Sequence, residues 1–188
     1  MILLIFNNFI ENPDFYTKVS AIENAQIDES ITVILENNHG GAIHLGGMLI
    51  NTIQKSEATI TLTIDGTAAS TAAFVWTWIH MAKFYGHYKN VKTAFKNNKA
   101  SLIFHRPRNI DIKGERFIEQ LSDSEINESF ITYVDRFDKS FVYLLNKYPS
   151  AKVFSLDNPS TFLSAKNAYE SYVSNKDIVI LLDAIAIA

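Results

Sequence analysis

Short apolar runs with the composition of buried strands recur along the chain and alternate with helix-like segments. The run at 31–35 is continuous and rich in β-branched residues, which is typical of a strand buried on both faces of a sheet. We expect further strands at 2–6, 58–64, 100–104, 151–156 and 177–182. Consecutive parallel strands need crossover connections, which are usually helices, so the alternation predicts an α/β fold with a largely parallel sheet.

The segments between these runs are expected to be helical or polar. Helices are predicted at 15–24, 48–53, 70–85, 125–147 and 162–169, and a lysine-rich surface stretch at 86–99. Ser122 and Glu125 fit a capping box at the start of the long fourth helix. Apolar residues occupy two sides of that helix, so we expect it to project and pack against another subunit. The alternative is that it lies along the sheet.

Composition narrows the class of protein. The 188 residues are 47% hydrophobic and 20% charged, with a net charge of −3, which fits a single globular domain without a nucleic-acid surface. The absence of cysteine excludes disulfides, thiol catalysis and cysteine-ligated zinc. The apolar start at 1–6 is too short for a signal peptide or a membrane span, so we expect a cytoplasmic protein with no membrane contact. His80 and His87 have no carboxylate at ligand spacing, and we expect neither a metal nor another cofactor.

The junction 66–73 combines small residues with one hydroxyl, at Ser70, between a strand and a long apolar helix. Backbone N–H groups at a helix N-terminus favour negative charge, and a serine nucleophile works well there. A serine at this place can also be a simple N-cap. Trp76 and Trp78, on the same helix, are interpreted as core residues.

Other residues complete a candidate set for acyl transfer. His105 and Asp157 each follow a predicted strand, as Ser70 does, and the carboxyl ends of strands form the ligand-binding edge of an open α/β sheet. A Ser-His-Asp set needs a base within reach of the hydroxyl and an acid that orients the base. The glycines 40–41 and the N–H of Thr71 would supply the donors to an oxyanion.

Several segments resemble the proteolytic subunit of the Clp protease, a ClpP-like peptidase of family S14 in the ClpP/crotonase superfamily. The similar segments are the strand, Gly-Gly turn and helix at 31–53, the nucleophile motif Gly-Thr-Ala-Ala-Ser at 66–70, the His-Arg-Pro element at 105–107 and Phe-Leu-Ser-Ala at 162–165. They follow the family's order over about residues 30–180.

The resemblance implies a ClpP/crotonase-like fold of repeated β-β-α and βαβ units in one domain, 1–188. Its head would comprise 1–114 and 150–188, and its handle region 115–149. Ser70 would be the nucleophile, His105 the general base and Asp157 the acid, with Gly41 and Thr71 as oxyanion donors. The implied protein is a serine endopeptidase acting on peptide or unfolded protein, in a ring-shaped homo-oligomer for which stacked heptamers are one arrangement.

The chain also departs from the family pattern. The spacing from Ser70 to His105 is longer, and Ser160 stands where the family has its acid, so Asp157 must replace it or the third member is not an acid. The chain begins at the first strand, without the family's axial loop, so docking to an ATPase unfoldase is doubtful. The element at 172–177 lacks the family's glycine.

Three alternative functions stay open. One is a weak or inactive ClpP-like subunit with a structural or regulatory role in a ring. Another is a crotonase-type acyl-CoA enzyme, although no acidic residue stands at Ser70 or beside Gly41. The last is a Ser-Lys peptidase that uses Lys83 or Lys113 as its base.

Overall fold

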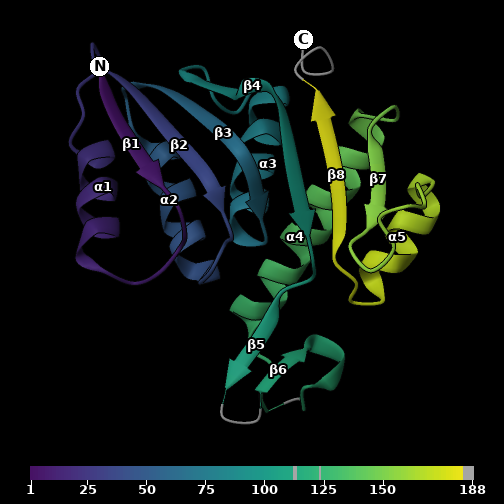
Figure 1. Ribbon diagram of the computed structural model, residues 1–188. Coiled ribbons are helices and arrows are strands. Elements are labelled where there is room, and N and C mark those ends of the chain that lie inside the picture. The colour runs from purple at the N-terminus through teal and green to yellow at the C-terminus, as the bar shows by residue number, and fades with distance from the viewer. Residues whose placement is uncertain (112–113, 123, 184–188) are drawn as a thin grey trace.

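A mixed, mostly parallel sheet forms the centre of the computed structural model, which describes residues 1–111, 114–122 and 124–183. Its six strands have the order β1-β2-β3-β4-β8-β7 (Figure 1). They are β1 (Ile2–Phe6), β2 (Ser30–Asn38), β3 (Thr59–Ala69), β4 (Val91–Phe104), β7 (Lys152–Ser155) and β8 (Ile178–Asp183). Strands β1 to β4 are parallel neighbours, whereas β8 runs antiparallel to β4 and β7. The prediction of an α/β fold with a largely parallel sheet is therefore confirmed.

Helices cover one face of this sheet. The described helices are α1 (Pro13–Glu23), α2 (Ile43–Lys55), α3 (Thr71–Phe84), α4 (Glu128–Lys147), α5 (Ala165–Val173) and the short 3₁₀-helix η1 (Ile118–Gln120). Helices α1 to α4 lie behind the sheet in Figure 1. A hairpin of β5 (Arg108–Asp111) and β6 (Gly114–Phe117) projects below the edge at which β1 to β4 end. That edge is where an α/β sheet usually binds its ligand.

Helix α3 is the central element of the core. Its Trp76 is fully buried, which confirms the interpretation of that tryptophan, whereas Trp78 is half-buried beneath the guanidinium of Arg136. Phe74 stacks on Phe137 of α4 with a centroid distance of 4.3 Å. Burying side chains of this size contributes about 1.5–3 kcal/mol each, so this contact fixes α4 on α3.

Helix α4 packs against the hydrophobic core over most of its length. Val134, Phe137, Phe141 and Leu144 are buried, and Tyr143 on the adjoining side is buried with them. Ile131, nearer the start of the helix, is 48% exposed, and the first turns extend past the sheet toward the hairpin (Figure 1). The helix therefore packs against the core over most of its length, which agrees with the alternative prediction that it lies along the sheet. Its packing against another subunit stays a prediction.

Several predicted boundaries were wrong because tertiary pairing and capping decided them. The polar stretch 86–99 largely belongs to β4, whose residues from Val91 to Phe95 pair with the buried part of β3. Pairing with a buried neighbour outweighs the low strand preference of lysine and asparagine. Helix α2 begins at Ile43, directly after the glycine turn, and not at Met48.

The helix starts follow the side chains that accept backbone N–H groups. Helix α1 is capped by Asn12, through a bond of 2.8 Å from the N–H of Phe15. Helix α4 is capped by Asn127 and begins at Glu128, while the predicted capping box of Ser122 and Glu125 closes a turn before it. Helix α5 is capped by Ser164, so the predicted segment 162–169 is displaced toward the C-terminus.

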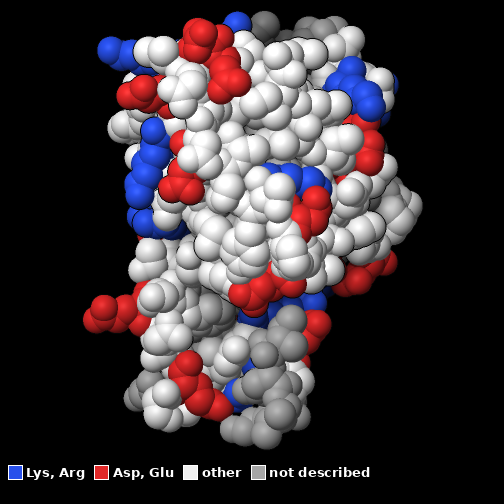
Figure 2. All heavy atoms as spheres, turned by 90° about the vertical axis from the view of Figure 1, so that its left-hand side faces the viewer, with Lys and Arg blue, Asp and Glu red and all other residues white. Residues whose placement is uncertain are grey.

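The surface on the α1 side carries charges of both signs in small separate groups, as Figure 2 shows. Among the described residues, no helix combines the length and apolar character that crossing a membrane requires. No group of three or more histidine, aspartate or glutamate side chains in the described ranges has the arrangement of a metal site.

His80, on the buried face of α3, is a core histidine. Its ring stacks on Trp76 with a centroid distance of 4.8 Å. Nδ1 lies 2.7 Å from the hydroxyl of Thr93 and Nε2 lies 2.5 Å from the hydroxyl of Tyr148. Burial, aided by the charges of Lys83 and Lys147, lowers the pKa of His80 to about 4.

The low pKa of His80 predicts acid sensitivity of the fold. The unfolded chain takes up the proton near pH 6.5 and the folded chain only near pH 4, so stability falls as pH drops through that window. We expect a loss of about 3 kcal/mol, measured by urea unfolding at pH 7 and pH 4. The variant His80→Gln should lose most of this dependence, and the exposed His87→Gln should keep it. Equal pH profiles for all three proteins would contradict the assignment.

Candidate active site

Ser70 lies on the sharp turn between β3 and α3. Its backbone has φ 53° and ψ −124°, outside the regions that residues other than glycine normally occupy. Such a conformation costs about 1–3 kcal/mol and persists only where the surroundings enforce it. Here the N–H of Ser70 donates to the carbonyl of Ile103 on β4 at 2.8 Å, and the carbonyl of Ser70 accepts from Phe74 at 3.0 Å.

The hydroxyl of Ser70 does not cap α3. The side chain makes no capping hydrogen bond, although the residue occupies the N-cap position. The simple N-cap interpretation of Ser70 is therefore not what the structure shows. A strained serine between a strand and a helix is the arrangement that presents the nucleophile in α/β-hydrolases.

The glycine turn between β2 and α2 packs directly against this serine. Gly40 and Gly41 have φ of 87° and 131°. A Cβ atom on Gly40 would lie 2.7 Å from the Cβ of Ser70, so only glycine allows this approach. The turn is fixed to the segment after β1, because Phe9 donates to the carbonyl of Gly40 at 2.7 Å and accepts from Ala42 at 2.8 Å.

Asn38, fully buried at the end of β2, also holds the glycine turn. Its side chain donates to the carbonyl of Phe6 and accepts from the N–H of Gly40, both at 2.8 Å. A buried amide with both ends bonded fixes the backbone around it. The turn is therefore held from the β1 side and the β2 side.

Two backbone N–H groups beside Ser70 are free to bind an anion. Those of Gly41 and Thr71 donate to no acceptor within the part of the chain that the structure describes. The hydroxyl of Thr71 donates to the carbonyl of Gly41 at 2.7 Å and so joins the turn to the start of α3. With the positive end of α3, these two N–H groups have the character of an oxyanion hole.

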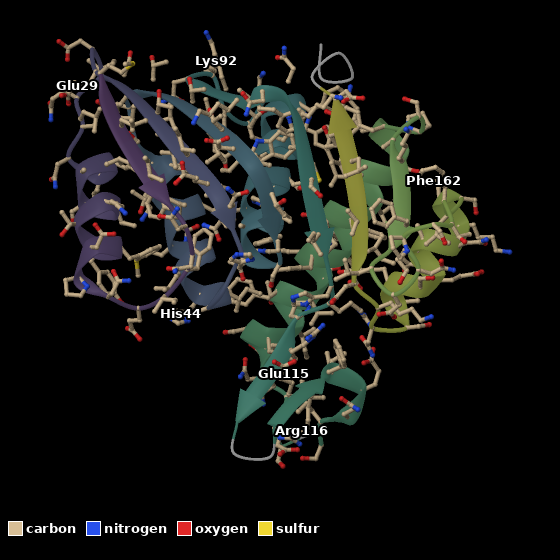
Figure 3. The ribbon with its side chains drawn as sticks, viewed as in Figure 1. Glu29, His44, Lys92, Glu115, Arg116 and Phe162 are labelled. Atoms are coloured by element: carbon tan, nitrogen blue, oxygen red, sulfur yellow. The ribbon has the colours of Figure 1, made fainter. Side chains whose placement is uncertain are left out.

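A cavity of about 590 Å³ brings the predicted residues together. Gly41, Ser70, Thr71 and His105 all line it. Further lining side chains come from other elements and include His39, His44, Arg108, Glu115 and Phe137. Figure 3 shows His44 near the lower edge of the sheet and Glu115 on the hairpin below it. The hairpin thus supplies one wall of the cavity.

His105 follows β4 directly and is held by its neighbour's backbone. Nδ1 lies 2.9 Å from the carbonyl oxygen of Arg106, which fixes the tautomer with hydrogen on Nδ1 and a lone pair on Nε2. Burial lowers the pKa of His105, and the charge of Arg108 lowers it further, against the raising effects of the Arg106 carbonyl, Asp177 and Glu115. A neutral imidazole with a free Nε2 can act as a general base.

No hydrogen bond joins Ser70 to His105 in the described structure. Both residues nevertheless line the same cavity. Catalytic hydrogen bonds are often long before substrate binds and tighten in the complex. The arrangement places Ser70 and His105 in one pocket without a hydrogen bond between them.

Asp157 is not among the residues that line this cavity. It lies exposed in the turn after β7, and Ser160 in the same turn is bonded to Asn158 at 2.9 Å. Of the predicted site residues, the structure therefore brings Gly41, Ser70, Thr71 and His105 together and leaves Asp157 apart. Lys83, one alternative base, is exposed at the end of α3, and Lys113 lies outside the described residues.

The ion pairs in and around the cavity were not predicted from the sequence; of their members, Arg108 and Glu115 line it. Arg108 binds Glu115 at 2.8 Å and Asp177 at 3.0 Å. Its neighbour Arg106 binds Asp138 at 2.9 Å and also pairs with Glu119. The sequence gives little sign of these ion pairs, because Arg106 and Arg108 are single charges on either side of Pro107 and most of their acidic partners lie far along the chain.

No family model matches the sequence, and no curated protein is significantly similar to it.

Proposed function

We propose that this chain is a serine hydrolase of the ClpP type, with the ClpP/crotonase-like fold, that cleaves peptide bonds. The observation that carries the proposal is the backbone of Ser70, whose positive φ presents an uncapped hydroxyl in the cavity that His105 also lines. Folded proteins rarely hold a serine in such a conformation without a functional reason. The two free N–H groups beside it are the donors that an oxyanion needs.

The chemistry follows from these positions. Ser70 Oγ attacks the peptide carbonyl while His105 Nε2 takes the hydroxyl proton, and the N–H groups of Gly41 and Thr71 bind the resulting oxyanion. His105 then gives the proton to the departing amine, which leaves an acyl ester on Ser70. Water attacks the ester with His105 again as the base, and this step releases the acid and restores the serine.

Labelling with a fluorophosphonate, read by intact mass, tests the proposal. We expect one adduct on the wild-type protein and none on Ser70→Ala, because only an activated serine attacks the probe at an appreciable rate. Ser101→Ala, on β4, is a matched control that should keep the adduct. An adduct that persists in Ser70→Ala would refute the role of Ser70.

A second function, an inactive subunit of a ring, is favoured by two observations. No hydrogen bond joins Ser70 to His105 in the described structure, and Asp157 does not line their cavity. An inactive subunit would give no adduct while still eluting as a large assembly. Size-exclusion chromatography of the same samples separates the two functions and also tests the proposed homo-oligomer.

A further inference from the structure

The sheet places a carboxylate beside His105, and it is not that of Asp157. Strands β4 and β8 are antiparallel, and the last residue of β4, Phe104, is paired with the first residue of β8, Ile178. The pairing ends at this couple, and the next residues beyond it are His105 on one strand and Asp177 on the other. The charge of Asp177 acts on the imidazole, because it raises the pKa of His105.

The strand order places Asp157 farther away. Asp157 follows β7, which is separated from β4 by the whole of β8. Each step between neighbouring strands is about 4.8 Å, so the end of β7 lies about 10 Å from the end of β4. The turn after β7 also leads Asp157 into solvent.

Arg108, which lines the cavity, binds the carboxylate of Asp177, which is not itself a lining residue. The guanidinium binds one oxygen of Asp177 at 3.0 Å and an oxygen of Glu115 at 2.8 Å. Its side chain is 25% exposed and lines the cavity together with Ser70 and His105. Arg108 also lies 5.1 Å from the ring centroid of Phe117. These contacts fix the guanidinium and, through it, the carboxylate.

We infer that Asp177 is the positioning carboxylate of the Ser70–His105 site, with Arg108 as its tether. The inference rests on the proposed function, and it replaces Asp157 as the acid. Asp177 acts through its charge, because Nδ1 of His105 donates to the Arg106 carbonyl, and this charge stabilises the imidazolium that forms when His105 takes the proton of Ser70. Arg108 keeps the carboxylate beside His105, and its own positive charge opposes protonation of the imidazole, which favours a base that is free at neutral pH.

The charges around His105 give opposite predictions for two variants. Asp177 and Glu115 raise the pKa of His105, whereas Arg108 lowers it. The variant Asp177→Asn should therefore lower the pKa of His105, and Arg108→Gln should raise it. Both variants break the same ion pair, so a purely structural role would move the pKa in the same direction in both.

The experiment is an NMR titration of the His105 imidazole in the wild type, Asp177→Asn, Arg108→Gln and Asp157→Asn. Opposite shifts in the first two variants, with none in Asp157→Asn, are expected. A shift in Asp157→Asn but not in Asp177→Asn would overturn the inference. Because the titration needs no turnover, it decides about Asp177 even if fluorophosphonate labelling of the wild type fails.

Labelling kinetics give the second readout. Removal of the acid from a Ser-His-Asp set lowers the rate by up to about 10⁴-fold. We expect a loss of at least about 10²-fold for Asp177→Asn, with the midpoint of the pH–rate profile moved to lower pH. Asp157→Asn should label at the wild-type rate, and partial recovery in Asp177→Glu would support a carboxylate requirement. Wild-type labelling by Asp177→Asn would refute the inference and leave the proposed function intact.

Discussion

Replacing His105 with glutamine is expected to slow fluorophosphonate labelling of Ser70 by about 10²–10⁴-fold, the usual contribution of a general base. Glutamine retains hydrogen-bonding groups but cannot take a proton at neutral pH. His105 is the histidine held by the Arg106 carbonyl in the tautomer that frees Nε2. Stopped labelling reactions, quantified by intact mass, measure the rate.

His39 and His44 line the same cavity and provide the strictest controls for His105. Substituted singly by glutamine, they should change the labelling rate far less than His105→Gln does. A loss of comparable size at His39 or His44, with little effect at His105, would assign the base to another histidine. Circular dichroism of each variant checks that the fold is retained.

Replacing Gly41 with alanine is expected to destabilise the protein by about 3 kcal/mol or more and to abolish labelling. An added Cβ would lie 2.3 Å from the carbonyl oxygen of Phe9, which is backbone and cannot rotate away. The residue also has φ 131°, where a side chain adds strain. Overpacking and strain each cost about 1–3 kcal/mol. Relief requires the turn to move, and the N–H of Gly41 moves with it.

Gly86→Ala is a matched control for that experiment. Gly86 also has a positive φ, 79°, but an added Cβ would meet no atom within 4 Å. Gly86→Ala should lower the free energy of unfolding by about 1 kcal/mol, from backbone strain alone, and should leave labelling unchanged. Urea unfolding of both variants gives the difference. Equal stability losses would show that the contact with Phe9 does not matter.

The strand-to-helix turn at Ser70 and the glycine turn that faces it could be predicted from the sequence. Small residues around Ser70 allow a close approach of strand, helix and glycine turn, and glycines at 40–41 are required where φ is positive. The same reasoning placed His105 at the end of a buried strand. These inferences succeeded because they depend on residues within a few positions of one another, where sterics and backbone conformation dominate.

The ends of helices and strands were harder to predict, because they depend on contacts with residues outside the local segment. Val91 and Lys92 fall in the stretch predicted to be polar surface, yet they form a strand because β3 lies beside them. The helix expected from Glu125 starts later because the side chain of Asn127 accepts the N–H of Phe130. Local propensity is a weak preference, and a single well-placed hydrogen bond or neighbouring strand overrides it.

The sequence by itself determined the alternation of strands and helices, the turn at Ser70 and the glycines that pack against it. Only the tertiary structure decided which acid lies near His105. Asp157 and Asp177 both stand next to a strand in the sequence, and nothing local distinguishes them. Asp177 directly precedes β8, which pairs with β4, whereas Asp157 follows β7, one strand farther from β4. Strand order is set by the packing of the whole sheet, and no short stretch of sequence encodes it.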